Sequence, residues 1–274
     1  MNYIHRRAPR PSPVVHTVGA LMNTLTVSDV TLTFGGLNAL THVHLEIQPG
    51  LITSIIGPNG AGKTSLLNCI SGFYNPTSGE IHYGRERLTR ASPHQVTKKG
   101  IARAFQNLEL FGGLSVLDNL MLARHRHLTY GFFHALVYWG KASRLEAENR
   151  AFVEDVIDFM ELEAYRKRAV GSLSYGIQKR VEVARALTLG PRLLLLDEPM
   201  AGMNIEEKED MVRFILDIQK EREITVVLVE HDLGVVMDIS DQVYVLDFGE
   251  LIGAGGPKEV AANRKVVDAY IGED

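Results

Sequence analysis

The feature that most constrains this chain is a glycine-rich loop at residues 57–64, which reads Gly-Pro-Asn-Gly-Ala-Gly-Lys-Thr. It satisfies the pattern G-x-x-x-x-G-K-[ST], in which backbone N–H groups point into a ring that can surround phosphate oxygens. Residues 51–56 form an apolar run that predicts a strand before the loop, and residues 64–70 predict a helix that Ser71 and Gly72 end. The sequence therefore predicts a strand, loop and helix that bind a nucleotide, rather than an ordinary glycine-rich turn.

Two side chains at the end of the loop have the chemistry that a nucleotide requires. Lys63 is expected to neutralise the β- and γ-phosphates, and Thr64 is expected to supply a hydroxyl to Mg²⁺. The helix that follows adds the positive end of its dipole. The expected cofactors are therefore ATP and Mg²⁺. The residues predicted to contact the nucleotide here are Gly57, Pro58, Asn59, Gly60, Ala61, Gly62, Lys63, Thr64 and Ser65.

The rest of the chain alternates between strand and helix patterns. Buried strands are predicted at residues 193–197, 224–229 and 242–246 with helices between them, which indicates a mainly parallel sheet. From about residue 107 to 189 the pattern is helical, most clearly over 143–162, where apolar residues fall on one face. Ser143 and Glu146 have the spacing of a capping box. The prediction is an α/β core with a helical subdomain inserted at about 107–189.

The first 22 residues are basic and proline-rich, so they are predicted to be a disordered extension of a domain that spans residues 23–274. Residues 24–34 and 42–47 then alternate as short strands do. Met22 is a candidate for the true start of the protein. Intact-mass analysis of the protein made from its own locus would contradict this if residues 1–21 were present.

Charge, hydropathy and cysteine content exclude several classes of partner and location. A net charge of −4 provides no basic field for nucleic acid. The single cysteine, Cys69, cannot form an internal disulfide, and its apolar neighbours predict a buried hydrophobic role. The sequence has no run of about 18 apolar residues, and prolines interrupt its start, so neither a membrane span nor export is expected.

Two adjacent carboxylates follow the apolar run at residues 193–196. Asp197 can join the coordination shell of Mg²⁺, and Glu198 can orient or deprotonate water. A plain junction between strand and turn could also carry such a pair. Because the phosphate-binding pattern lies upstream, the catalytic interpretation is favoured.

Three further segments are weak signals when each is taken alone. Ser174 and Gly176 precede a helical run and could offer a hydroxyl and N–H groups to phosphate, although a helix-capping serine would look the same. Gln106 and His231 are polar residues that follow predicted strands. Their order along the chain is more informative than any one of them.

The series formed by residues 57–64, Gln106, residues 174–176, residues 197–198, Asn204 and His231 resembles the motif order of ABC-type ATPases, from about residue 25 to the C-terminus. The resemblance implies a P-loop NTPase core with an N-terminal antiparallel β subdomain. It also implies that Glu198 is the general base, that His231 contacts the γ-phosphate and that Phe34 stacks on adenine. Gln106 would sense both Mg²⁺ and the γ-phosphate.

In this family the segment at Ser174 and Gly176 contacts ATP held by a second ATPase subunit, so the resemblance implies a head-to-tail dimer of identical or different chains. The sequence departs from the family pattern at Tyr175 and Ile177, and it has Asn204 where aspartate is common. The contact made by residue 177 is therefore in question, whereas Ser174 and Gly176 are kept.

Several segments resemble the ATP-binding subunits of branched-chain amino acid importers. They are Tyr175 and residues 105–107, 201–204, 229–232 and 268–273. This resemblance implies integral membrane permease subunits as partners, a solute-binding protein as an indirect partner, and a peripheral location on the cytoplasmic face of the inner membrane.

Alternatives remain open at this stage. The same role could serve another solute, such as an aromatic acid, urea or an amide, or lipopolysaccharide export. A soluble ABC ATPase of translation or DNA repair is disfavoured by the single motif set and by the absence of a zinc-cluster pattern or basic stripe. A switch without catalysis is disfavoured because the catalytic residue types are all present.

Two histidine pairs and an aromatic stretch are interpreted conservatively. His42 with His44, and His125 with His127, have no accompanying carboxylate or cysteine cluster in the sequence, so solvated or capping roles are expected rather than metal binding. Residues 131–139 are too short to span a bilayer and are expected to be core, with a docking surface for a membrane subunit as the alternative.

Overall fold

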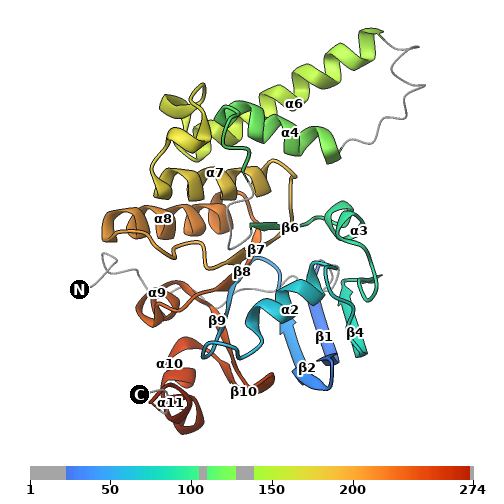
Figure 1. Ribbon diagram of the computed structural model, residues 1–274, viewed down its shortest axis with the longest axis vertical. Helices are drawn as coiled ribbons and strands as arrows, with labels where there is room; N and C mark the ends of the chain where they lie inside the picture. Colours follow the sequence, from blue (N-terminus) through green and yellow to red (C-terminus); the bar gives the residue numbers. More distant parts are fainter. Residues whose placement is uncertain (1–22, 105–109, 128–138, 272–274) are drawn as a thin grey trace.

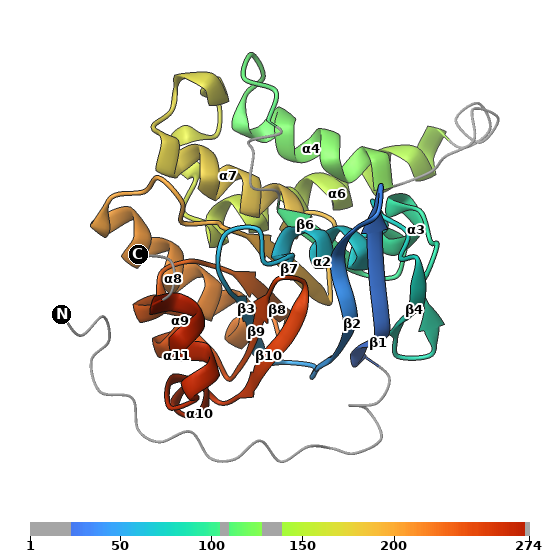
Figure 2. The ribbon, with the colours of Figure 1, turned by 60° about the horizontal axis from the view of Figure 1, so that its bottom comes forward.

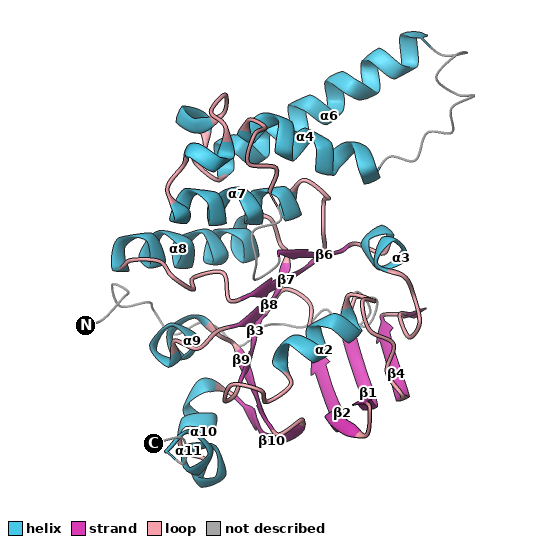
Figure 3. Ribbon diagram, in the orientation of Figure 1, coloured by secondary structure: helices cyan, strands magenta, loops and turns pink. Residues whose placement is uncertain are grey.

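The computed structural model describes residues 23–104, 110–127 and 139–271, and the rest of the chain lies outside this description. The predicted extension at residues 1–22 is outside it, so that assignment stays a prediction. Within the described residues the chain forms two β-sheets, and helices pack on both of them (Figures 1 and 3).

The larger sheet has six strands in the order β10-β9-β3-β8-β7-β6. They are β3 (Ile52–Ile56), β6 (Ile101–Ala104), β7 (Leu193–Asp197), β8 (Thr225–Val229), β9 (Gln242–Asp247) and β10 (Glu250–Gly255). Neighbouring strands are parallel except β9 and β10, which are antiparallel. Every residue of β3, β7 and β8 is buried, as expected of strands covered on both faces. The predicted mainly parallel sheet is confirmed, and β10 is an addition that the sequence did not predict.

Successive residues of β7 face two different hydrophobic cores, because side chains alternate along a strand. Leu194 and Leu196 pack in a core that includes residues of α7 (Tyr175–Leu187) and α8 (Ile205–Glu221). Leu193 and Leu195 pack with α2 (Lys63–Ile70) and the smaller sheet. Cys69 of α2 lies in this second core, where burial raises the pKa of its thiol to about 12. The predicted buried, hydrophobic role of Cys69 is confirmed.

The smaller sheet is antiparallel and has the strand order β2-β1-β4-β5. Its strands are β1 (Leu25–Phe34), β2 (Leu37–Ile47), β4 (Ser78–Tyr83) and β5 (Glu86–Arg87). Instead of the predicted short strands, β1 and β2 form one long hairpin of 10 and 11 residues. Gly35 and Gly36 join them with φ angles of 52° and 90°, which glycine adopts at little cost in a tight hairpin turn.

The remaining helices are α3 (Pro93–Lys98), α4 (Val116–His127), α6 (Trp139–Phe159), α9 (Leu233–Ile239), α10 (Pro257–Ala261) and α11 (Arg264–Ile271), with 3-10 turns at Glu163–Tyr165 and Val170–Ser172. Helices α4, α6 and α7 lie between β6 and β7 in the chain and gather at one end of the molecule (Figure 1). Figure 2 shows α9, α10 and α11 together beside β9 and β10. None of the helices in the described ranges is long and apolar enough to cross a membrane.

Helix α6 corrects one prediction about the inserted segment. It begins at Trp139, so Ser143 is already inside the helix, and the predicted capping box at Ser143 and Glu146 is wrong. The apolar face is as predicted, since Val153 and Ile157 are completely buried. The exact boundary of a helical subdomain at about 107–189 stays a prediction.

Candidate functional site

The glycine-rich loop connects β3 to α2, and its backbone requires glycine at two close contacts. A Cβ atom on Gly57 would lie 2.0 Å from the carbonyl oxygen of Leu246, and one on Gly62 would lie 2.6 Å from that of Ala39. Both glycines have positive φ angles, of 148° and 100°. The loop is thus held between the ends of β9 and β2. Gly62 is the N-cap residue of α2, and no side chain caps this helix end, so its first N–H groups can serve an anion.

Lys63 closes the loop from the first position of α2. Its side chain is buried, and Nζ donates hydrogen bonds to the carbonyl oxygens of Gly57 at 2.6 Å and Pro58 at 2.8 Å. A buried ammonium group must be satisfied by acceptors, and here the loop backbone supplies them. The cation is therefore fixed against the backbone of the loop, where it lines a cleft.

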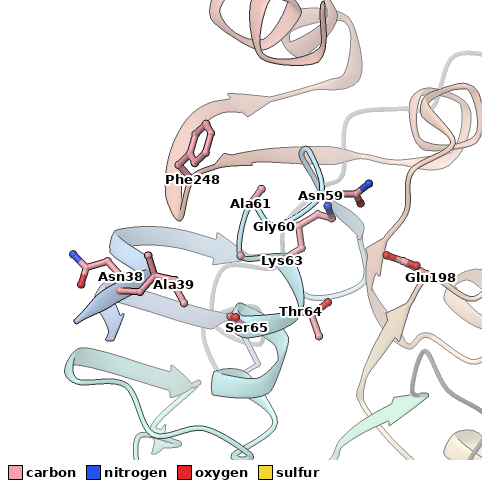
Figure 4. A pocket seen from close by; sticks show the side chains of 12 residues that line it. Asn38, Ala39, Asn59, Gly60, Ala61, Lys63, Thr64, Ser65, Glu198 and Phe248 are labelled. Atoms are coloured by element: carbon pink, nitrogen blue, oxygen red, sulfur yellow. The ribbon is translucent and has the colours of Figure 1, made fainter. Parts of the chain in front are cut away.

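A cleft of about 410 Å³ opens beside the loop, a volume within the range of small-molecule sites. The cleft is lined by Leu37, Asn38, Ala39, Asn59, Gly60, Ala61, Gly62, Lys63, Thr64, Ser65, Glu198 and Phe248. Figure 4 shows Lys63 and Asn59 between Asn38 on one side and Glu198 on the other. The structure thus brings Glu198 to the predicted phosphate loop. Asn38 and Phe248 were missed, because nothing in their local sequence marks them as lining residues.

The carboxyl ends of β7 and β8 bring together residues that are far apart in the sequence. Glu198 follows β7 and His231 follows β8, and Oε1 of Glu198 lies 2.5 Å from Nε2 of His231. Glu198 has a positive φ of 50°, and its N–H donates to the carbonyl oxygen of Val229 at 2.9 Å. The turn directs the carboxylate into the cleft, while Asp197 before it is buried and accepts a hydrogen bond from Arg103 at 2.6 Å.

Glu230 is a site residue that sequence reasoning missed. Its buried carboxylate accepts hydrogen bonds from the backbone N–H of Met200 at 3.0 Å and of His231 at 3.1 Å. It therefore ties the turn after Glu198 to the segment that holds His231. Burial raises the pKa of Glu230, although the two backbone hydrogen bonds act in the opposite direction. The acidic residue beside His231 was visible in the sequence, but its partners were not.

We expect Glu230 to make stability depend on pH. Because its pKa is raised in the folded state, the folded protein binds the proton more tightly, and stability falls as pH rises from about 4.5 through the raised pKa. Glu230→Gln should remove this fall in the free energy of unfolding with rising pH, as measured by urea unfolding at a series of pH values. The exposed Glu209→Gln is the control and should parallel the wild type. If stability depended on pH in the same way for Glu230→Gln as for the wild type, the role of Glu230 in this pH dependence would be contradicted.

Ser174 and Gly176 lie at the N-terminus of α7 and do not line the cleft of their own chain. Ser174 is the N-cap residue, and its hydroxyl oxygen accepts from the N–H of Ile177 at 3.5 Å. A Cβ on Gly176 would lie 2.4 Å from the Cδ atom of Glu207. Glu207 also accepts from the N–H of Asn204 at 3.2 Å in a capping box that starts α8. The first turn of α7 therefore packs directly against the first turn of α8, through Gly176 and Glu207.

We expect Gly176→Ala to disturb the cap of α8, because the new methyl group needs the space of the Glu207 side chain. The substitution should be less favourable in the wild type than in a Glu207→Ala background by about 1 kcal/mol, the usual size of a capping contribution. Urea unfolding of the four proteins in the cycle measures this difference. Equal effects in both backgrounds would show that the two residues are not coupled.

The structure does not bring every predicted residue to the cleft. Phe34 is half-exposed at the end of β1 and packs edge-on against Tyr74, with ring centroids 5.2 Å apart, but it does not line the cleft. Its stacking on adenine stays a prediction. Gln106 lies outside the described residues.

The histidine pair on β2 is solvated as predicted, since the side chains of His42 and His44 are 70% and 64% exposed, and it has one carboxylate neighbour. Oδ1 of Asp29 lies 2.7 Å from Nδ1 of His42 and 3.5 Å from Nε2 of His44. The hydrogen bond with His42 lowers the pKa of Asp29. Within the described ranges no group of three such side chains forms a metal site. The side chains of His125 and His127 and those of residues 131–139 are outside the description.

Comparison with known proteins gives consistent matches. A sequence profile described as ABC transporter matches residues 40–201. The chain is 39% identical over 249 residues to the high-affinity branched-chain amino acid transport ATP-binding protein BraF of Pseudomonas aeruginosa, covering 91% of this chain and 98% of that protein. It is 37% identical to the corresponding protein LivG of Escherichia coli K12, with the same coverage.

Two solved structures illustrate the fold and assembly of relatives. The ADP conformation of MJ1267, an ATP-binding cassette of an ABC transporter, superimposes with a TM-score of 0.79 at 30% identity, covering 92% of this chain and 99% of that one. The dimeric structure of MJ0796, a bacterial ABC transporter cassette, has a TM-score of 0.72 at 27% identity, covering 85% and 98%.

Proposed function

This chain belongs to the ABC transporter family of ATP-binding proteins, and we propose that it is the ATP-hydrolysing subunit of an importer for branched-chain amino acids or related small solutes. The observation that carries the proposal is the cleft in which the phosphate-binding loop faces Glu198, with His231 hydrogen-bonded to that carboxylate. The solute class comes from the resemblance to BraF and LivG, whose names state branched-chain amino acid transport.

For hydrolysis we propose that Glu198 is the general base. It would accept a proton from the water that attacks the γ-phosphorus, and the bond to the bridging oxygen would break to give ADP and phosphate. His231 would hold the Glu198 carboxylate in place and contact the γ-phosphate. Residues 57–65 would bind the phosphates through backbone N–H groups and Lys63, with Phe34 on the adenine.

The end of β7 fits a divalent cation. Oδ1 of Asp197 is buried and has no hydrogen-bond partner among the described residues, which is costly for a carboxylate oxygen unless a cation binds it. Oxygen atoms are the ligands that Mg²⁺ prefers. We propose Asp197 and Thr64 as ligands, together with Gln106, which the resemblance implies. When bound, Mg²⁺ would neutralise charge on the β- and γ-phosphates.

The position of Ser174 and Gly176 supports a dimeric working unit. They do not line the cleft of their own chain, and a relative, MJ0796, forms a dimer. We propose that they contact ATP held by a second ATPase subunit, so that the γ-phosphate joins two chains and its loss releases them. Integral membrane permease subunits, served by a solute-binding protein, would use this motion at the cytoplasmic face of the inner membrane.

Affinity purification of the tagged chain from its native membranes in mild detergent tests the proposal. We expect integral membrane permease subunits to co-purify, and we expect ATPase activity of the complex to rise with a binding protein loaded with leucine, isoleucine or valine. If ATPase activity rose only with an aromatic acid, urea or an amide, the proposed solute class would change accordingly. Recovery with lipopolysaccharide export subunits, or only with ribosomes or DNA-repair proteins, would overturn the importer assignment.

A further inference from the structure

A buried arginine lies directly beside the proposed metal ligand. Arg103 on β6 donates from Nη2 to Oδ2 of Asp197 at 2.6 Å, and the exposed fractions of the two side chains are 5% and 0%. In the parallel pair of β6 and β7, Arg103 is in register with Leu195. Asp197 is two residues further along, so both side chains leave the same face of the sheet. That face is the one covered by α2.

The same guanidinium group also holds the end of α2. Its Nη1 donates to Oδ1 of Asn68 at 2.6 Å and to the hydroxyl oxygen of Ser71 at 3.2 Å. Ser71 in turn donates to the carbonyl oxygen of Leu67 at 2.6 Å. One buried cation therefore joins β6, the end of β7 and the helix whose first turn carries Thr64. The planar fork of arginine suits these divergent acceptors, which a lysine ammonium could not satisfy in the same geometry.

The charge arrangement explains why an arginine is needed at this place. A carboxylate buried as completely as that of Asp197 is strongly unfavourable without a positive partner. Arg103 bonds one of its oxygens and leaves the other, Oδ1, without a hydrogen-bond partner in the described part of the chain. The charge is thus compensated while one oxygen stays available to a cation.

We propose that Arg103 is the positioning residue of the metal site. It compensates the buried charge of Asp197, fixes its orientation so that Oδ1 is the oxygen presented to the cation, and sets the spacing between Asp197 and α2. The inference rests on the proposed function in so far as the cation is the one that accompanies the nucleotide. The link between the two side chains can be tested without any nucleotide.

The first experiment is a thermal-unfolding cycle in EDTA, without nucleotide, on the full chain. Arg103→Met leaves Asp197 as an uncompensated buried charge, so its Tm should fall by roughly 10 °C. Adding Asp197→Asn to that variant should restore at least half of the loss, whereas Asp197→Asn alone should lower Tm. The matched control is Arg87→Met, which breaks an exposed pair with Glu80 and should change Tm by at most about 2 °C. If the double variant recovered none of the lost Tm, the conclusion that Arg103 compensates the charge of Asp197 would be overturned.

The second experiment asks whether the arginine fork orients the ligand. Arg103→Lys keeps the charge and should recover most of the Tm, but it cannot hold Asn68, Ser71 and Asp197 together. Mn²⁺ affinity of the ADP-loaded protein, measured by electron paramagnetic resonance, should therefore be roughly fivefold weaker in Arg103→Lys, within the range expected for a residue that supports a metal ligand. Unchanged Mn²⁺ affinity would overturn the positioning role. Failure of the wild type to bind ADP would instead contradict the proposed function.

Discussion

Replacing Glu198 with glutamine is expected to lower the rate of ATP hydrolysis at least about a hundredfold, the loss typical of removing a general base. The amide has nearly the same shape as the carboxylate and can still hydrogen-bond to His231, which lies 2.5 Å from Oε1 in the wild type. Its nitrogen cannot accept the proton of the attacking water. ATP binding should persist, because the loop at residues 57–64 and Lys63 are unchanged.

Phosphate release measures the rate, and size-exclusion chromatography with light scattering measures assembly. Glu198→Gln should accumulate a closed dimer in ATP, because the γ-phosphate, which we propose joins the two chains, is no longer removed. Glu206→Gln, an exposed carboxylate in the first turn of α8, is the matched control and should behave as the wild type. Undiminished ATPase activity in Glu198→Gln would remove Glu198 as the base.

Replacing Lys63 with methionine is expected to weaken ATP binding at least about a hundredfold and to remove measurable hydrolysis, because the proposed charge-assisted contact to the β- and γ-phosphates is lost. Methionine fills similar space, but it cannot donate to the carbonyl oxygens of Gly57 and Pro58. We therefore also expect a loss of stability of about 1–3 kcal/mol from these unsatisfied acceptors.

Binding of a fluorescent ATP analogue and urea unfolding separate the two effects of Lys63→Met. The control is Lys98→Met, which removes an exposed ammonium from the last turn of α3 and should leave both measurements near the wild type. ATP affinity equal to that of the wild type would contradict the role of Lys63, even if stability fell.

The central part of the fold was predictable because its signals are local. The run of six residues before Gly57, the loop itself and the residues of β7 and β8 each carry their pattern within a few neighbours, and the structure confirms them. Strand β5 was missed because it has only two residues, both exposed, and β10 was missed because its partly exposed residues lack a clear alternation. The Ser143 prediction failed because a four-residue capping pattern also occurs within helices, and α6 had already begun.

The site was predictable only where the order of motifs identified it. Glu198 and His231 are separated by 33 positions, and their contact depends on β7 and β8 being neighbours in the sheet. No local pattern joins Arg103 to Asp197, because the bond spans 94 positions and arises from the parallel register of β6 with β7. Phe248 reaches the cleft through the turn between β9 and β10, a placement that tertiary structure alone decides.

The burial of Cys69 has a practical consequence for studying the dimer. It is the only cysteine in the sequence, and its thiol, shielded in the core with a pKa of about 12, gives almost no thiolate at neutral pH. Maleimides and thiol-directed spin labels should therefore not react with the native chain. A single cysteine introduced on an exposed helix would be the sole labelled position, so that distances between two copies could be followed through a nucleotide cycle without first removing a native thiol.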